Sequence, residues 1–155
     1  MADVVDPATR SRMMSGIRGK NTRPELLIRK ALHAGGGRYR IHCKDLPGNP
    51  DLCFPKYRAV IFVHGCFWHG HDCHLFKWPK TRPEFWRTKI DRNREVDARA
   101  MAELAAAGWR VGTVWECALK GSGRLPLTDL VDQLADWLGS GRQNLVIREV
   151  QADDR

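Results

Sequence analysis

The sequence lacks the features that would place a protein in or across a membrane. It contains no apolar run close to the roughly 20 residues that a membrane-spanning helix needs. The first residues, Met-Ala-Asp-Val-Val-Asp, lack the basic leader and apolar core of a secretory signal. No basic amphipathic tail stands out either. We therefore expect no membrane association and a cytoplasmic location.

The sequence has too few acidic residues to balance its basic ones, and it lacks an even number of cysteines. Five cysteines are an odd number for a disulfide framework, and two of them lie among histidines, so bound metal in a reducing compartment is the better explanation. Only 18 Asp and Glu stand against 26 Lys and Arg, which gives a formal net charge of +8. This excess of positive charge favours a polyanionic partner, and nucleic acid is the commonest one.

A chain of 155 residues fits one domain with one core. We expect a basic N-terminal arm or helix over residues 1–20, a single domain over 21–150 and a disordered tail over 151–155. The arm either orders on DNA or is a solvated terminal helix.

Hydrophobic periodicity predicts helices that alternate with strands. One capping box, Thr22 with Glu25, begins a helix that ends at the glycines at 35–37, and another, Thr81 with Glu84, begins a helix that runs to Gly108. The other predicted elements are strands at 38–42, 51–54, 58–63, 109–115 and 144–150, and a helix at 127–138 with Leu127, Leu130, Val131, Leu134, Trp137 and Leu138 inward. The pattern indicates an α/β fold with a mixed sheet and helices on both faces.

The loop at 64–82 contains six potential metal ligands within eleven residues: His64, Cys66, His69, His71, Cys73 and His74. Thiolate and imidazole are ligands that Zn²⁺ prefers, in sets of four at structural sites. We expect Cys66, His71 and Cys73 to supply three, with either a neighbouring histidine or Cys117 as the fourth. Cys43 and Cys53 are expected to be core residues.

Histidines of this loop that do not bind zinc require another role. If Cys117 is the fourth ligand, His64 and His69 remain beside the metal, where imidazoles can exchange protons near neutral pH. Asp51, at the start of a strand, is the candidate ligand for Mg²⁺, a hard ion that prefers oxygen. A turn residue is the alternative interpretation of Asp51.

At these residues the sequence closely resembles the very-short-patch DNA mismatch repair endonucleases, bacterial enzymes that nick DNA at a T:G mismatch. The resemblance rests on Ala8-Thr9-Arg10-Ser11, Leu46-Pro47-Gly48 to Asp51, Val60-Ile61-Phe62 to Gly65-Cys66-Phe67-Trp68-His69, Thr81-Arg82 to Phe85-Trp86, and Gly108-Trp109-Arg110-Val111 to Trp115-Glu116-Cys117-Ala118-Leu119. It implies a restriction-endonuclease-like mixed central sheet flanked by helices, with a zinc-stabilised loop.

The resemblance also implies roles for the site residues. Asp51 and the backbone carbonyl of Val63 hold Mg²⁺, His69 with Glu25 acts on the attacking water, and His64 assists at the phosphate. From the residues alone, Glu25 is a capping-box residue.

The implied substrate is double-stranded DNA in which deamination of 5-methylcytosine has left thymine opposite guanine. The phosphodiester 5′ of that thymine is hydrolysed to start very-short-patch repair. The resemblance further implies a monomer, a paired cytosine methyltransferase, and mismatch-repair or repair-synthesis proteins as possible partners.

Phe67 and Trp68 are candidates for aromatic wedges that unstack a weakened base step, with burial as the alternative interpretation. Trp86, Lys89 and Asn93 share one helix face by their spacing. By the resemblance, Trp86 joins the wedge, Lys89 and Asn93 address the mismatched bases, and Met13 and Met14 support the wedge from the opposite groove. A solvated helix face with one half-buried Trp is the alternative interpretation of these three residues.

Two other functions are compatible with the residues. A zinc-containing DNA-binding module without catalysis would need only the loop, the charge and the aromatics. A hydrolase that uses the loop zinc directly would need a coordination position left open.

Overall fold

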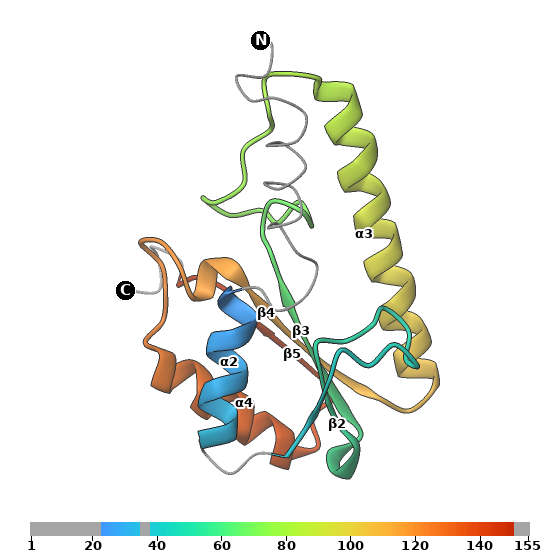
Figure 1. Ribbon diagram of the computed structural model, residues 1–155, viewed down its shortest axis with the longest axis vertical. Helices are drawn as coiled ribbons and strands as arrows, with labels where there is room; N and C mark the ends of the chain where they lie inside the picture. Colours follow the sequence, from blue (N-terminus) through green and yellow to red (C-terminus); the bar gives the residue numbers. More distant parts are fainter. Residues whose placement is uncertain (1–22, 35–37, 151–155) are drawn as a thin grey trace, which may run out of the picture.

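The computed structural model describes residues 23–34 and 38–150 (Figure 1). The expected N-terminal arm, with Met13 and Met14, and the expected tail at 151–155 lie outside the described residues. The α/β fold class is confirmed, with a mixed sheet of five strands and helices around it. No helix in the described part of the chain is long and apolar enough to cross a membrane.

The sheet has the strand order β1-β2-β3-β4-β5, which is also the order in the sequence. The elements are α2 Arg23–Ala34, β1 Arg40–Ile41, β2 Leu52–Phe54, the 3₁₀ turn η1 Pro55–Tyr57, β3 Ala59–His64, α3 Pro83–Ala106, β4 Arg110–Trp115, the 3₁₀ turn η2 Glu116–Ala118, α4 Leu127–Ser140 and β5 Asn144–Ile147. The strands β1, β2 and β3 pair antiparallel, whereas β3, β4 and β5 pair parallel through crossovers that contain α3 and α4. The carboxyl ends of β3, β4 and β5 therefore meet at one edge.

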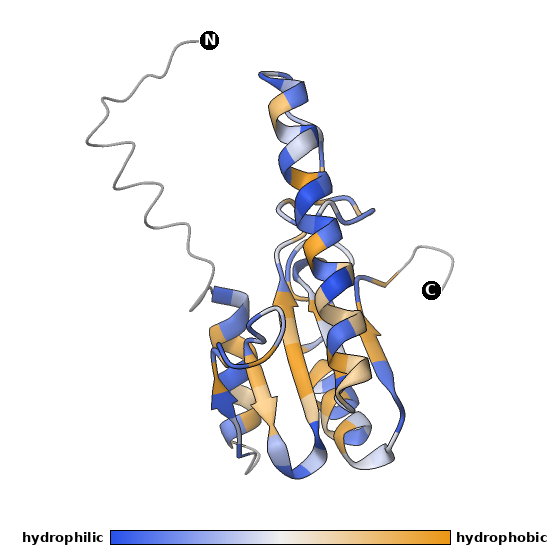
Figure 2. Cartoon of the chain, turned by 90° about the vertical axis from the view of Figure 1, so that its right-hand side faces the viewer, coloured by the Kyte–Doolittle hydropathy of each residue, from blue (hydrophilic) through white to orange (hydrophobic). Residues whose placement is uncertain are grey.

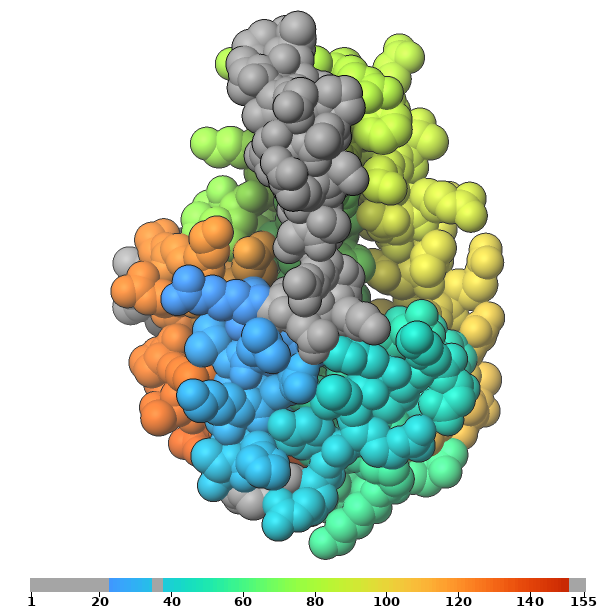
Figure 3. Space-filling view, viewed as in Figure 1, coloured from blue at the N-terminus to red at the C-terminus, as the bar shows by residue number. Residues whose placement is uncertain are grey.

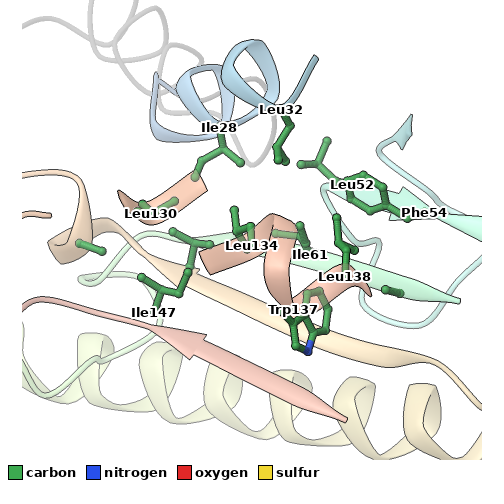
Figure 4. Close-up of a cluster of buried hydrophobic side chains, with 13 residues drawn as sticks. Ile28, Leu32, Leu52, Phe54, Ile61, Leu130, Leu134, Trp137, Leu138 and Ile147 are labelled. Carbon is green, nitrogen blue, oxygen red and sulfur yellow. The ribbon is translucent and has the colours of Figure 1, made fainter. Parts of the chain in front are cut away.

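Successive residues of β3 are buried on opposite faces of the sheet. Ala59 and Ile61 pack in the cluster that joins the sheet to α2 and α4, where Ile28, Leu134 and Trp137 lie (Figure 4). The larger helix α3 covers the other face and extends well beyond the sheet (Figure 2). There Leu104 packs with the alternate strand residues, Val60, Phe62 and Val111. The apolar run predicted a strand covered on both faces, and the structure has one.

Several boundaries differ from the expected ones. The capping box at Thr81 and Glu84 is wrong, because Arg82 occupies the N-cap with a left-handed backbone, φ 54°, and no side chain caps the helix. Pro83 starts α3 instead, since its fixed φ suits a first turn that needs no N–H partner. This helix ends at Ala106 and β5 at Ile147, both earlier than expected, while α4 continues to Ser140.

The predicted inward face of α4 needs one correction, because Leu127 was expected inward and is 37% exposed. In α2 the buried side consists of Glu25, Ile28 and Leu32, whereas Leu27 is 39% exposed. On the surface, α2 lies against the segment that leads through β1 (Figure 3), and Tyr39 Oη donates to the carbonyl of Arg29 at 2.8 Å. That contact ties the middle of α2 to the chain just before β1.

Candidate active site and metal centre

Asp51, His64 and His69 meet at the carboxyl end of β3. Because β2 runs antiparallel to β3, with Leu52 paired to Ile61, the residue before β2 lies beside the last residues of β3. Asp51, His64 and His69 line one cavity of about 140 Å³, and Asp97 of α3 lines the same cavity. Residues from three separate segments thus form one pocket.

The Asp51 carboxyl is held by backbone and buried beside a second acid. Its Oδ2 accepts a hydrogen bond of 2.6 Å from the Val63 N–H. Glu25, 1% exposed, lies next to it. Glu25 Oε2 is 2.7 Å from His42 Nε2 and accepts a 3.2 Å bond from Arg29 Nη1. The interpretation of Glu25 as a capping-box residue did not foresee that its side chain is buried beside Asp51.

The adjacent buried carboxyl groups of Asp51 and Glu25 create a negative electrostatic potential that attracts a cation. Burial and the neighbouring Glu25 charge raise the pKa of Asp51 to about 7, although the Val63 N–H opposes the shift. A divalent ion beside Asp51 would reverse this shift, because it favours the ionised carboxylate. The arrangement therefore suits a hard cation with oxygen ligands.

His64 and His69 are stacked in the pocket, with ring centroids 3.9 Å apart and planes 9° from parallel. Burial and the adjacent His69 lower the pKa of His64 to about 3, so its imidazole is neutral at physiological pH. His69 Nδ1 lies 2.5 Å from Asp97 Oδ2. A carboxylate at one ring nitrogen fixes the orientation and the tautomer of the imidazole.

Helix α3 also fixes the backbone on both sides of His69. Asn93 Nδ2 donates to the carbonyl of Trp68 at 2.8 Å, and Arg94 Nη2 donates to the carbonyl of Gly70. Gly70 has φ +60°, and a Cβ there would lie 2.6 Å from Arg94 Nε, so the guanidinium needs a glycine beneath it. One helix thus positions the ring and both flanking peptides.

Sequence reasoning missed Asp97. Its only signal is the helical spacing, four residues after Asn93 on the same face. Acids are common along this helix, so the spacing alone could not single it out.

Cys66, His71, Cys73 and Cys117 form a separate group behind the pocket. Their ligand atoms all lie within 4.8 Å of one another, and the group could hold a metal ion. His71 Nδ1 is 3.6 Å from both Cys66 Sγ and Cys117 Sγ. Tetrahedral zinc with the usual bond lengths separates its sulfur and nitrogen ligands by roughly 3.6 Å. The geometry therefore fits a zinc ion.

The thiols of this group require a cation to ionise. Burial raises the pKa of Cys66 and of Cys117 above that of a free thiol. The backbone already provides N–H···S bonds, from Cys117 N to Cys66 Sγ and from Glu149 N to Cys117 Sγ, each 3.3 Å. His64 and His69 are not members of this group, but with Asp97 they form a second group close enough to hold a metal.

The proposed wedge residues are packed against one another. Phe67 lies with its ring centroid 5.3 Å from those of both Trp68 and Trp86, and all three side chains are half-buried. Lys89 is exposed beside them. Asn93 uses its amide nitrogen on Trp68, a contact that its predicted role on the bases did not foresee. Met14 lies outside the described residues.

Comparison with known proteins identifies similar sequences. The sequence model of the family "DNA mismatch endonuclease Vsr" matches residues 2–75. A type II nicking enzyme of Xanthomonas oryzae is 52% identical over 125 residues, which cover 81% of this chain and 92% of the relative. The DNA mismatch endonuclease Vsr of Escherichia coli is 47% identical over 138 residues, 89% of this chain and 88% of the relative. A type II nicking enzyme of Neisseria meningitidis is 42% identical over 138 residues, 88% of this chain and 99% of the relative.

Proposed function

Because this chain belongs to the family of the DNA mismatch endonuclease Vsr, we propose that it nicks double-stranded DNA at a T:G mismatch left by deamination of 5-methylcytosine. It hydrolyses the phosphodiester 5′ of the mismatched thymine and so starts very-short-patch repair. The observation that carries this proposal is the shared pocket of Asp51, His64 and His69. The enzyme acts as a monomer in the bacterial cytoplasm, before repair-synthesis proteins.

Asp51 and the backbone carbonyl of Val63 hold Mg²⁺ in this proposal. The Val63 N–H points to Asp51, and the N–H and C=O of one strand residue face the same neighbour in a ladder, which supports a carbonyl on the Asp51 side. When bound, the ion polarises the phosphate and stabilises the departing oxygen. Val63 has no side-chain oxygen, so only its backbone can contribute.

His69 accepts the proton of the attacking water. The contact of its Nδ1 with Asp97 at 2.5 Å supports this role, because that carboxylate holds the ring in the pocket and leaves Nε2 as the nitrogen that can accept a proton. Glu25 assists from beside Asp51, where it lies buried. His64, kept neutral by its burial, donates a hydrogen bond to the phosphate rather than a full charge.

Zinc at Cys66, His71, Cys73 and Cys117 is structural in this account. Four protein ligands complete a tetrahedron and leave no position for water, which argues against a zinc hydrolase. A zinc ion bound there would fix the loop on both sides of His69, because Cys66 precedes His69 and both His71 and Cys73 follow it.

Phe67, Trp68 and Trp86 form the wedge that opens the mismatched step. Their mutual packing leaves each ring only half-buried, as a preformed wedge requires. Unstacking costs a few kcal/mol per step and least at a mismatch, so wedging favours T:G sites. Lys89, Asn93 and Met14 contact the bases or the opposite groove.

The test is a nicking assay on paired T:G and C:G duplexes of otherwise equal sequence, with and without Mg²⁺. We expect one nick, mapped 5′ of the thymine, only on the T:G duplex and only with Mg²⁺. Binding of T:G DNA without any cut, unchanged in Asp51→Ala, would instead establish a non-catalytic DNA-binding module.

A further inference from the structure

The metal group has a partner on the side away from the thiols. His71 presents Nδ1 to the sulfur atoms of Cys66 and Cys117, while its Nε2 lies 3.6 Å from Asp72 Oδ1. The His71 ring is 7% exposed and stacks on Trp115 with centroids 3.9 Å apart. A ligand histidine whose second nitrogen faces a carboxylate is a common way to fix its orientation in metal sites.

Asp72 is itself held from a distant part of the chain. Arg148, directly after β5, donates from Nη1 to Asp72 Oδ1 at 2.7 Å and from Nη2 to the Asp72 carbonyl at 3.0 Å. The fork of the guanidinium therefore grips the side chain and the backbone of one residue. Asp72 is 83% exposed by its side chain, so without Arg148 it would sample many rotamers.

Glu149 and Val150, the two residues after Arg148, also contact the region around the cysteine group. Glu149 N–H donates to Cys117 Sγ at 3.3 Å, and the Glu149 carboxylate pairs with His74. Val150 N–H donates to the Gly123 carbonyl at 2.9 Å, which ties the segment to the loop after η2. Segment 148–150 thus reaches two of the candidate metal ligands. It contacts Cys117 directly, and it reaches His71 through Asp72.

We propose that Arg148 and Asp72 are positioning residues for the metal ligand His71, and that segment 148–150 sets how tightly the site retains zinc. The inference rests on the proposed zinc site. A thiolate-rich set of three cysteines and one histidine around Zn²⁺ carries a net negative charge, which the Arg148 guanidinium and the Glu149 N–H offset.

The test measures zinc affinity of the full chain by competition with a chromophoric chelator, without DNA. Loss of an outer-shell partner commonly weakens metal binding by about tenfold to a hundredfold. We expect such weakening in Arg148→Ala and Asp72→Asn, and a double variant no weaker than the worse single one, because both act through one contact. The matched control is the exposed pair Arg142 and Asp136, 3.1 Å apart. Arg142→Ala and Asp136→Asn should leave the affinity unchanged.

Three further variants keep the test decisive if Arg148→Ala does not fold. Arg148→Lys keeps the charge but not the fork, and should also weaken zinc binding. Glu149→Pro removes the N–H donor to Cys117 Sγ, whereas Glu149→Ala retains it, so of these two only the proline variant should bind zinc more weakly. Affinities within twofold of the wild type in Arg148→Lys and Asp72→Asn, or a wild-type chain that binds no zinc, would overturn the inference. Nicking is measured separately, so failure of the nuclease proposal leaves the zinc result interpretable.

Discussion

Replacing Asp51 with Asn distinguishes two effects of this buried acid, its electrostatic cost to folding stability and its role as a proposed ligand of Mg²⁺. Burial raises the pKa of Asp51 from 3.8 to about 7 in the metal-free protein. A raised pKa in the folded state means that ionisation of Asp51 lowers the free energy of unfolding. The metal-free protein therefore has its full stability below pH 3.8 and loses part of it as the pH rises through about 7. At about 1.4 kcal/mol per pKa unit, the loss above pH 7 amounts to roughly 4 kcal/mol.

Asn carries no charge and can still accept the Val63 hydrogen bond through its amide oxygen. Asp51→Asn should therefore unfold at a higher denaturant concentration than the wild type in magnesium-free, zinc-containing buffer. The advantage should be small near pH 4, grow toward pH 7 and then level off. Addition of Mg²⁺ should stabilise the wild type by mass action but leave the variant unchanged. Nicking by the variant should be lost.

Chemical unfolding at several pH values, followed by fluorescence, is the assay. The control is Asp45→Asn, the same chemical change at a side chain that is 65% exposed, which should show no such pH trend. The reasoning is refuted if Asp51→Asn is less stable than the wild type above pH 7, or if Mg²⁺ stabilises both proteins equally.

Three other substitutions probe the remaining parts of the site. His69→Ala should fold and bind T:G DNA but nick it about 10²- to 10⁴-fold more slowly, and near-normal single-turnover nicking would remove His69 from the chemistry. Cys117→Ser should lower both the folded yield and the zinc content, measured by atomic emission, because structural zinc contributes folding free energy; a stable zinc-free variant would contradict this. Trp68→Ala should reduce the preference for T:G over C:G duplexes in binding titrations, whereas an unchanged preference would assign Trp68 to packing alone.

The parts of the fold that depend on local pattern could be predicted from the sequence. The apolar run at 59–63 predicted a strand buried on both faces, because no alternation means no solvent-facing side. The clustered cysteines and histidines predicted three members of the group that the structure brings together, Cys66, His71 and Cys73, and Cys117 was one of two candidates for the fourth. In both cases the residue types themselves carry the chemistry.

The parts of the fold and of the site that depend on residues distant in the sequence could not be predicted. Asp97 resembles any other acid on a solvated helix until the fold brings it to His69. Arg82 adopts a left-handed backbone that residue preferences disfavour, so Thr81 and Glu84 resemble a capping box that does not form. Glu25 has the position of a cap residue in the sequence, and only the packing of α2 against the sheet buries it beside Asp51.

The location of a divalent ion tests the central claim most directly. Crystals of the protein with T:G DNA and Mn²⁺ in place of Mg²⁺ would reveal the ion by its anomalous scattering. We expect a peak between the Asp51 carboxylate and the Val63 carbonyl, separate from the cysteine group. A peak at His64, His69 and Asp97, with none at Asp51, would contradict it, because both imidazoles would then be ligands and could not act on water or phosphate.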